Sequence, residues 1–224
     1  MVRKAEGLAR KGSQKWLQKV VDEAPAVLNA QIISLLNLSE DEIITWLSPL
    51  VADDFAEYQD QAFLDRLQIK LPKVSLKDFW PTRGPVWDGL AKSDSGKVFL
   101  FEAKSHIPEI VSPGTAAGPK SLARIQQSLV ETKRYLGVKA KQDWSASFYQ
   151  YTNRLAHLYL LRVLNDIPAY LVFVHFVNDT EMNGPQSRIE WQGAIKLLHS
   201  YLGIGRHKLS RYIADVFVDV KKDL

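Results

Sequence analysis

The sequence predicts an α/β protein in which helices flank a mixed central sheet. Three observations predict this class. The first third of the chain shows helical periodicity, and residues 86–106 resemble two strands joined by a tight turn. Residues 170–177 then form a continuous apolar run, which is typical of a strand covered on both faces.

The helical first third divides into three predicted helices. Apolar residues recur at helical spacing over 14–37, where Pro25 is expected to break or kink the helix. A capping-box pattern, with Ser39 as the cap and Glu42 three residues later, predicts a short helix over 40–47, and a further helix is expected over about 52–67. We therefore expect residues 1–50 to be an N-terminal helical extension of an α/β domain that covers residues 51–224.

The remaining elements alternate between strands and helices. A turn-rich segment at 93–96 separates predicted strands at 86–92 and 97–106, so the two strands are expected to pair as a hairpin. Beyond them we expect helices over 120–136, 143–165 and 190–202 and strands over 170–177 and 211–220, with Gly137 ending the first of these helices.

Composition excludes several classes of protein. The 224 residues include no cysteine, which excludes a disulfide scaffold, a thiol nucleophile and metal sites built on thiolates. No apolar run approaches the ~20 residues of a membrane span, and the first residues do not resemble a secretory signal. A cytoplasmic protein without a membrane partner is expected. The net charge of +4 permits a nucleic-acid partner without requiring one.

The predicted hairpin brings acidic and basic side chains together. A turn within 93–96 places Asp88 opposite one of residues 101–103, so that Glu102 lies in the same window. Lys104 follows Glu102 by two residues and therefore points to the same face of its strand. Two neighbouring carboxylates can hold Mg²⁺, and an adjacent lysine can orient a water molecule or stabilise charge on a phosphate.

The segments Pro85-Val-Trp-Asp88 and Phe101-Glu-Ala-Lys104 resemble the signature of the PD-(D/E)xK nuclease superfamily. The resemblance spans residues 52–177 and implies a restriction-endonuclease-like three-layer core, with its first meander strand at about 73–80. It also implies a Mg²⁺-dependent enzyme, in which Mn²⁺ can substitute, that hydrolyses phosphodiester bonds of DNA. Asp88 and Glu102 would bind the metal, and Lys104 would position or activate the attacking water. Trp87 stands where the family has a proline.

The resemblance also points to polar residues on the helix expected at 143–165. In the family this helix often carries a residue that faces the site, and Gln150 matches best, so it is expected to be catalytic. Asn153 and Arg154 follow at three and four residues and are expected to bind substrate. The alternative is a solvated polar stripe on an amphipathic helix, which for His157 is the favoured interpretation.

Three further residues are candidates. Glu57, on the helix expected at 52–67, matches an extra acidic metal ligand of several family members, although an exposed acidic helix is an equal alternative. Arg83 precedes Asp88 by five residues and is expected to bind the scissile phosphate. Lys120, at the start of the helix at 120–136, is expected to bind a flanking phosphate.

Two alternatives to the enzyme remain open. Glu102, Lys104 and Asp88 could be solvated residues that form a cross-strand ion pair at a strand end. The same fold could also be a catalytically silent module that binds nucleic acid or another protein. A homodimer is compatible with cleavage of both DNA strands, but the sequence shows no interface signal.

Overall fold

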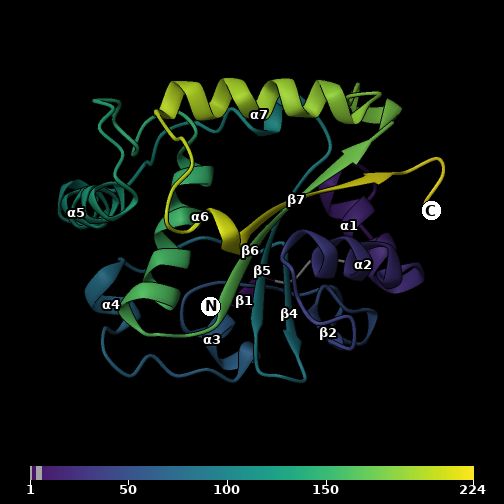
Figure 1. The fold of residues 1–224 in the computed structure, drawn as a ribbon, viewed down its shortest axis with the longest axis horizontal. Coiled ribbons are helices and arrows are strands. Elements are labelled where there is room, and N and C mark those ends of the chain that lie inside the picture. Colours follow the sequence, from purple (N-terminus) through teal and green to yellow (C-terminus); the bar gives the residue numbers. More distant parts are fainter. Residues whose placement is uncertain (1, 4–6) are drawn as a thin grey trace.

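A five-stranded mixed sheet lies at the centre of the computed structural model, which describes residues 2–3 and 7–224 (Figure 1). Its strand order is β2-β4-β5-β6-β7, with antiparallel pairing from β2 to β5 and parallel pairing from β5 to β7. A separate short ribbon pairs β1 with β3. The strands are β1 (Val2–Arg3), β2 (Ile44–Ser48), β3 (Glu57–Tyr58), β4 (Gly89–Ser93), β5 (Val98–Lys104), β6 (Ala169–Val177) and β7 (Ile213–Asp219).

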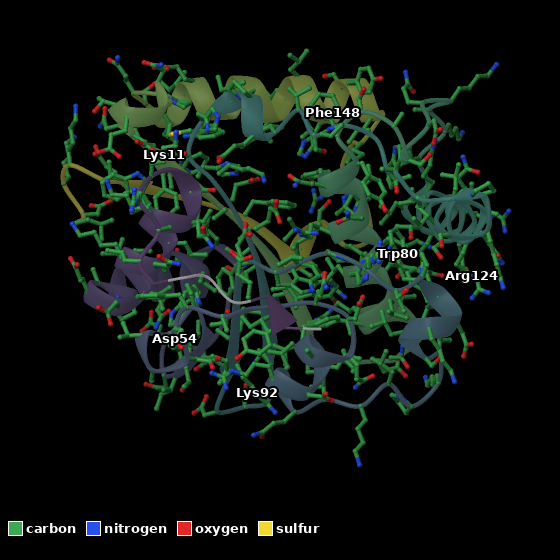
Figure 2. The ribbon with its side chains drawn as sticks, turned by 180° about the vertical axis from the view of Figure 1, so that it is seen from behind. Lys11, Asp54, Trp80, Lys92, Arg124 and Phe148 are labelled. Atoms are coloured by element: carbon green, nitrogen blue, oxygen red, sulfur yellow. The ribbon has the colours of Figure 1, made fainter. Side chains whose placement is uncertain are left out.

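Helices cover both faces of the sheet. They are α1 (Gly12–Glu23), α2 (Pro25–Leu35), α3 (Gln61–Leu67), α4 (Leu76–Phe79), α5 (Pro119–Leu136), α6 (Tyr149–Tyr159) and α7 (Arg188–Leu202). A π-helical turn, Leu160–Leu164, extends α6. Apolar side chains of α1 and α2 pack on one face of the sheet, and those of α3 to α7 pack on the other. In the view from behind, buried Trp80 lies beside α6, whereas Lys11 and Asp54 lie at the surface (Figure 2).

Alternation along β5 connects the two cores. Phe99 and Phe101 pack toward α1 and α2, while Val98 and Leu100 pack toward α6. Because side chains alternate along a strand, Glu102 shares the face of Leu100. The prediction of an α/β protein with a mixed sheet between helices is therefore confirmed, and the restriction-endonuclease-like topology stays a prediction.

Several predicted elements are confirmed with shifted ends. The hairpin forms as β4 and β5, the buried strand as β6 and the last strand as β7. Gly137 ends α5 in the left-handed conformation, with φ +74°, as expected of a helix-terminating glycine. Pro25 divides the helix expected over 14–37 into α1 and α2 and is the first residue of α2.

Two predicted helices in the first third are wrong. Residues 44–48 form strand β2, because alternate side chains face inward and the Trp46 ring packs on Phe101 at 4.3 Å between ring centroids. The helix expected over 52–67 is present only in its last part, as α3, and strand β3 lies within the first part of that range. The strand expected at 73–80 is also wrong, because Ser75 caps helix α4 there and β2 provides the first antiparallel strand.

Residues 1–50 do not stand apart from the sheet. This segment contributes strand β2 at the edge of the sheet and helices α1 and α2, which cover one face of the sheet. Residues 1 and 4–6 of the expected extension lie outside the described residues. The expected boundary at residue 50 therefore does not coincide with a break in the sheet. Within residues 2–3 and 7–224, no helix is both long and apolar enough to cross a bilayer.

Candidate active site

The register of the β4–β5 hairpin brings Asp88 to Glu102, as the sequence predicts. Gly89 pairs with Phe101, so Asp88, one residue earlier, stands level with Glu102 on the neighbouring strand. The backbone N–H of Ala103 donates a hydrogen bond of 2.7 Å to Asp88 Oδ2. This bond fixes the Asp88 carboxylate against the end of β5.

Lys104 connects this strand end to helix α6. Its Nζ donates to Glu102 Oε1 at 2.6 Å and to Gln150 Oε1 at 2.9 Å. The two side chains of β5 therefore share one face, and Gln150 in the first turn of α6 meets them there. The predicted convergence of Asp88, Glu102, Lys104 and Gln150 is present in the structure.

Arg154 holds the second oxygen of Glu102. Its Nε and Nη2 lie 2.6 Å and 2.5 Å from Glu102 Oε2, and Nη2 also donates to the carbonyl of Val86 at 2.7 Å. Nη1 donates to Asn153 Oδ1 at 2.8 Å. Because these partners occupy the guanidinium, Arg154 orients Glu102 in this structure, and contact with a phosphate stays a prediction for Arg154 and Asn153.

Burial and charge set the ionisation of the cluster. Burial, and then the charge of Glu102, raise the pKa of Asp88. Burial acts to raise the pKa of Glu102 as well, but Arg154 and Lys104 outweigh it and lower that pKa. Burial acts to lower the pKa of Lys104, but Glu102 and Asp88 raise it. Lys104 is therefore a cation and a hydrogen-bond donor at neutral pH.

These side chains line one groove of about 480 Å³, here called the Asp88 groove. One wall is the β4–β5 hairpin, and others are the first turn of α6, the loop at 112–116 and the start of α1. Eight of the nine predicted site residues line it: Glu57, Arg83, Asp88, Glu102, Lys104, Gln150, Asn153 and Arg154. Lys120 does not line it and lies exposed on the first turn of α5.

Glu57 reaches the Asp88 groove from a different element than expected. It lies on strand β3, and not on a helix, and its side chain is buried. Gln14 Nε2 of α1 donates to Glu57 Oε1 at 2.8 Å. The interpretation of Glu57 as part of an exposed acidic helix is therefore wrong, and its role as a metal ligand stays a prediction.

The interpretation of the cluster as a solvated strand end is contradicted by its burial. The side chains of Glu102 and Lys104 are 3% and 13% exposed. The solvated polar stripe on the helix is wrong for Asn153, Arg154 and His157, which are buried, whereas Gln150 is exposed. His157 packs against the rings of Trp80 and Trp87, and its Nδ1 donates a hydrogen bond of 2.8 Å to the carbonyl oxygen of Asn153.

Sequence reasoning missed the residues that α1 and the loop at 112–116 bring to the groove. Ser13 and Gln14 lie more than 70 residues from Asp88 in sequence and reach it only because α1 packs on the sheet. The backbone N–H of Gln150 donates a hydrogen bond of 2.9 Å to Ser112 Oγ, and this bond fixes the start of α6. None of these residues belongs to a local pattern that could have indicated the site.

The donor atoms in the groove fit a hard divalent cation. Asp88 and Glu102 offer carboxylate oxygens, which Mg²⁺ prefers, and it usually needs only one or two carboxylates because it retains water. Asp88 Oδ2 accepts the hydrogen bond from the Ala103 N–H. The Asp88 side chain is partly exposed at the groove, so its other oxygen, Oδ1, is available to a cation. No cluster of three or more histidine, cysteine or acidic residues suited to a metal occurs in the described part of the chain.

Comparison of the chain with protein-family models, curated proteins and solved structures gave no match.

Proposed function

We propose that the protein is a divalent-metal-dependent nuclease that hydrolyses phosphodiester bonds of DNA. The observation that supports it most directly is the meeting of Asp88, Glu102 and Lys104 in one groove with Gln150 bonded to the lysine. These are the residue types that phosphodiester hydrolysis needs, because carboxylates hold a cation and a lysine stabilises negative charge on a phosphate.

Asp88 and Glu102 are the residues that would hold Mg²⁺, or Mn²⁺ in its place. The bound ion would act as a Lewis acid that stabilises the charge developing on the phosphate. Arg154 keeps Glu102 ionised and oriented, and the Ala103 N–H keeps Asp88 turned to the same end of the sheet. The two acidic side chains are thus arranged before any ligand arrives.

Lys104 serves as a positively charged hydrogen-bond donor. Two of its three N–H groups are directed to Glu102 and Gln150, which leaves one for a water molecule or a phosphate oxygen in the groove. Before a metal ion binds in the groove, the neighbouring carboxylates raise the pKa of Lys104 and keep it protonated, so it would position the attacking water or stabilise charge on the phosphate. Gln150 positions Lys104, and exposed Arg83 at the groove edge is placed to contact a phosphate.

The test compares two lysines of the same hairpin. Lys104→Met removes the groove lysine, and Lys97→Met removes a lysine that pairs with buried Glu42 at the other end of β5, at 2.8 Å. Each change breaks one ion pair to a buried glutamate. With labelled DNA and Mg²⁺ or Mn²⁺, we expect cleavage to be lost in Lys104→Met and in Asp88→Asn and kept in Lys97→Met. Equal cleavage by all three variants contradicts the proposal.

The alternative, a silent binding module, gives a different result in calorimetry. Such a module takes up DNA in a metal-free buffer and shows no Mg²⁺ or Mn²⁺ binding that depends on Asp88. A homodimer and a cytoplasmic location stay predictions from the sequence.

A further inference from the structure

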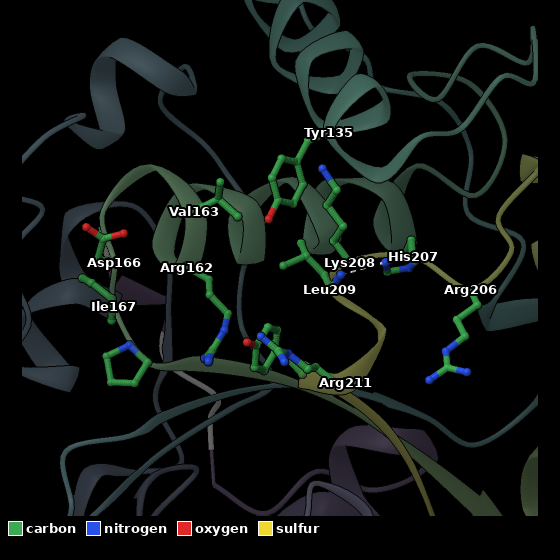
Figure 3. Close-up of a pocket in the computed structure, with 12 residues that line it drawn as sticks. Tyr135, Arg162, Val163, Asp166, Ile167, Arg206, His207, Lys208, Leu209 and Arg211 are labelled. Atoms are coloured by element: carbon green, nitrogen blue, oxygen red, sulfur yellow. Dashed lines mark hydrogen bonds between the residues drawn. The ribbon is translucent and has the colours of Figure 1, made fainter.

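A second concave surface lies at the opposite end of the central strands β5 and β6. It is a pocket of about 780 Å³, here called the Arg162 pocket, between the π-helical turn after α6, the end of α5 and the loop before β7 (Figure 3). The pocket adjoins the start of β6, where Ala169 pairs with Val98 at the beginning of β5. The Asp88 groove adjoins Lys104 at the end of β5. Val98 and Lys104 are six residues apart on the strand, which corresponds to about 20 Å at 3.3 Å per residue.

The lining of the Arg162 pocket is strongly basic. It contains Arg162, Arg206, Lys208 and Arg211 against a single acidic residue, Asp166. The Asp166 carboxylate is already paired with Lys73. Among the described residues, none of the four cations takes part in a salt bridge, so their charge is not neutralised within the protein.

Aromatic rings support these cations in place of carboxylates. The Arg162 guanidinium lies 3.2 Å from the centroid of the Tyr212 ring and donates to the carbonyl of Ala169 at 2.9 Å. The Arg211 guanidinium lies 4.7 Å from the same centroid. Lys208 extends toward Tyr135, 4.9 Å from its ring centroid (Figure 3). Cation–π contacts hold the charges in place without cancelling them.

This chemistry favours a chain of separate phosphate groups, such as a phosphodiester backbone, over a base or a small neutral ligand. The rings of Tyr135 and Tyr212 already contact cations of the protein, which leaves them less available for stacking with a base. Arg206, Lys208 and Arg211 are exposed and can reach phosphates, and arginine forks bind phosphate oxygens in a bidentate manner. We propose that the Arg162 pocket is a second DNA-contacting surface that binds the phosphate backbone of duplex DNA. The choice of DNA rests on the proposed function.

The test measures binding without cleavage. The triple variant Arg206→Ala, Lys208→Ala, Arg211→Ala is compared with the control triple Lys70→Ala, Lys196→Ala, Lys221→Ala, which removes three exposed cations outside this pocket. Fluorescence anisotropy with a labelled 20-base-pair duplex in EDTA gives Kd over a range of salt concentrations. Arg162 stays unchanged because it packs within the fold, and circular dichroism checks that both triples are folded.

We expect the pocket triple to bind DNA at least about tenfold more weakly than the control triple. The slope of log K against log salt should fall by about 3, close to one per removed phosphate contact. The loss should be the same for duplexes of different sequence, because phosphates carry no sequence information. Equal losses in both triples, or a mononucleotide that competes as well as the duplex, overturns the inference.

A parallel cleavage assay keeps this result separate from the proposed function. If the protein cleaves no DNA but the pocket triple loses binding, the nuclease proposal fails and the second DNA surface stands. If wild-type protein cleaves and the pocket triple binds like the control, the second surface alone is refuted.

Discussion

Replacing Arg154 by methionine tests the central electrostatic feature of the Asp88 groove. The Arg154 and Glu102 side chains are 5% and 3% exposed, and the substitution leaves a buried carboxylate with Lys104 as its remaining cation. It also removes the donor to the Val86 carbonyl. Breaking a buried ion pair on one side destabilises a protein by about 3–5 kcal/mol. We expect the lower end of that range, about 3 kcal/mol, because Lys104 remains.

Urea unfolding and thermal melting measure this loss. For a chain of this size, about 3 kcal/mol corresponds to a decrease in Tm of roughly 6–12 °C. Arg66→Met is the control, because Arg66 is 31% exposed and 3.6 Å from Asp53, and such a surface pair contributes about 1 kcal/mol or less. Adding Glu102→Gln to Arg154→Met should restore part of the stability, since no buried charge is then left unpaired. If Arg154→Met lies within about 1 kcal/mol of wild type, the reasoning is refuted.

Three further predictions follow from burial, charge and close packing. Burial lowers the pKa of His157 to about 4, so the unfolded chain takes up this proton first, and His157 alone should contribute a loss of about 3 kcal/mol of stability from pH 6.5 to pH 4. A His157→Gln variant should lack this fall in urea titrations, and identical pH profiles would contradict the assignment. Mg²⁺ at a free concentration of about 100 times its Kd should stabilise the folded protein by about 2.7 kcal/mol and so raise its Tm. Asp88→Asn should abolish this increase in Tm. Gly184→Ala should destabilise by about 1–3 kcal/mol, because its Cβ would lie 2.2 Å from the carbonyl oxygen of Ser105. Gly193→Ala on α7, with open space around it, should instead stabilise by up to about 1 kcal/mol; a reversed order in thermal melts would refute the packing argument.

The hairpin and its site were predictable because their signals are local. A turn of fixed length determines the register of two antiparallel strands, and that register alone places Asp88 beside Glu102. Gln150 and Arg154 are four residues apart on a helix, so both were expected on one face, and both contact the β5 pair.

Elements fixed by distant packing were not predictable. The segment 44–48 became a strand because β4 offered a free edge and because Phe101 offered a ring for Trp46. The capping-box glutamate, Glu42, instead accepts from Lys97 at 2.8 Å. Local pattern favoured a helix there, and tertiary pairing overrode it.

Strand β5 joins the antiparallel and parallel halves of the sheet, pairing with β4 on one side and β6 on the other. Its partner β6 lies about 70 residues later in the chain, so a ribosome must release most of the polypeptide before this strand can complete its hydrogen bonding. The groove residues on β5 are consequently assembled late in biosynthesis. The hairpin alone can bring Asp88 to Glu102, but the complete groove also needs Gln150 and Arg154 and cannot be assembled before α6 has been synthesised.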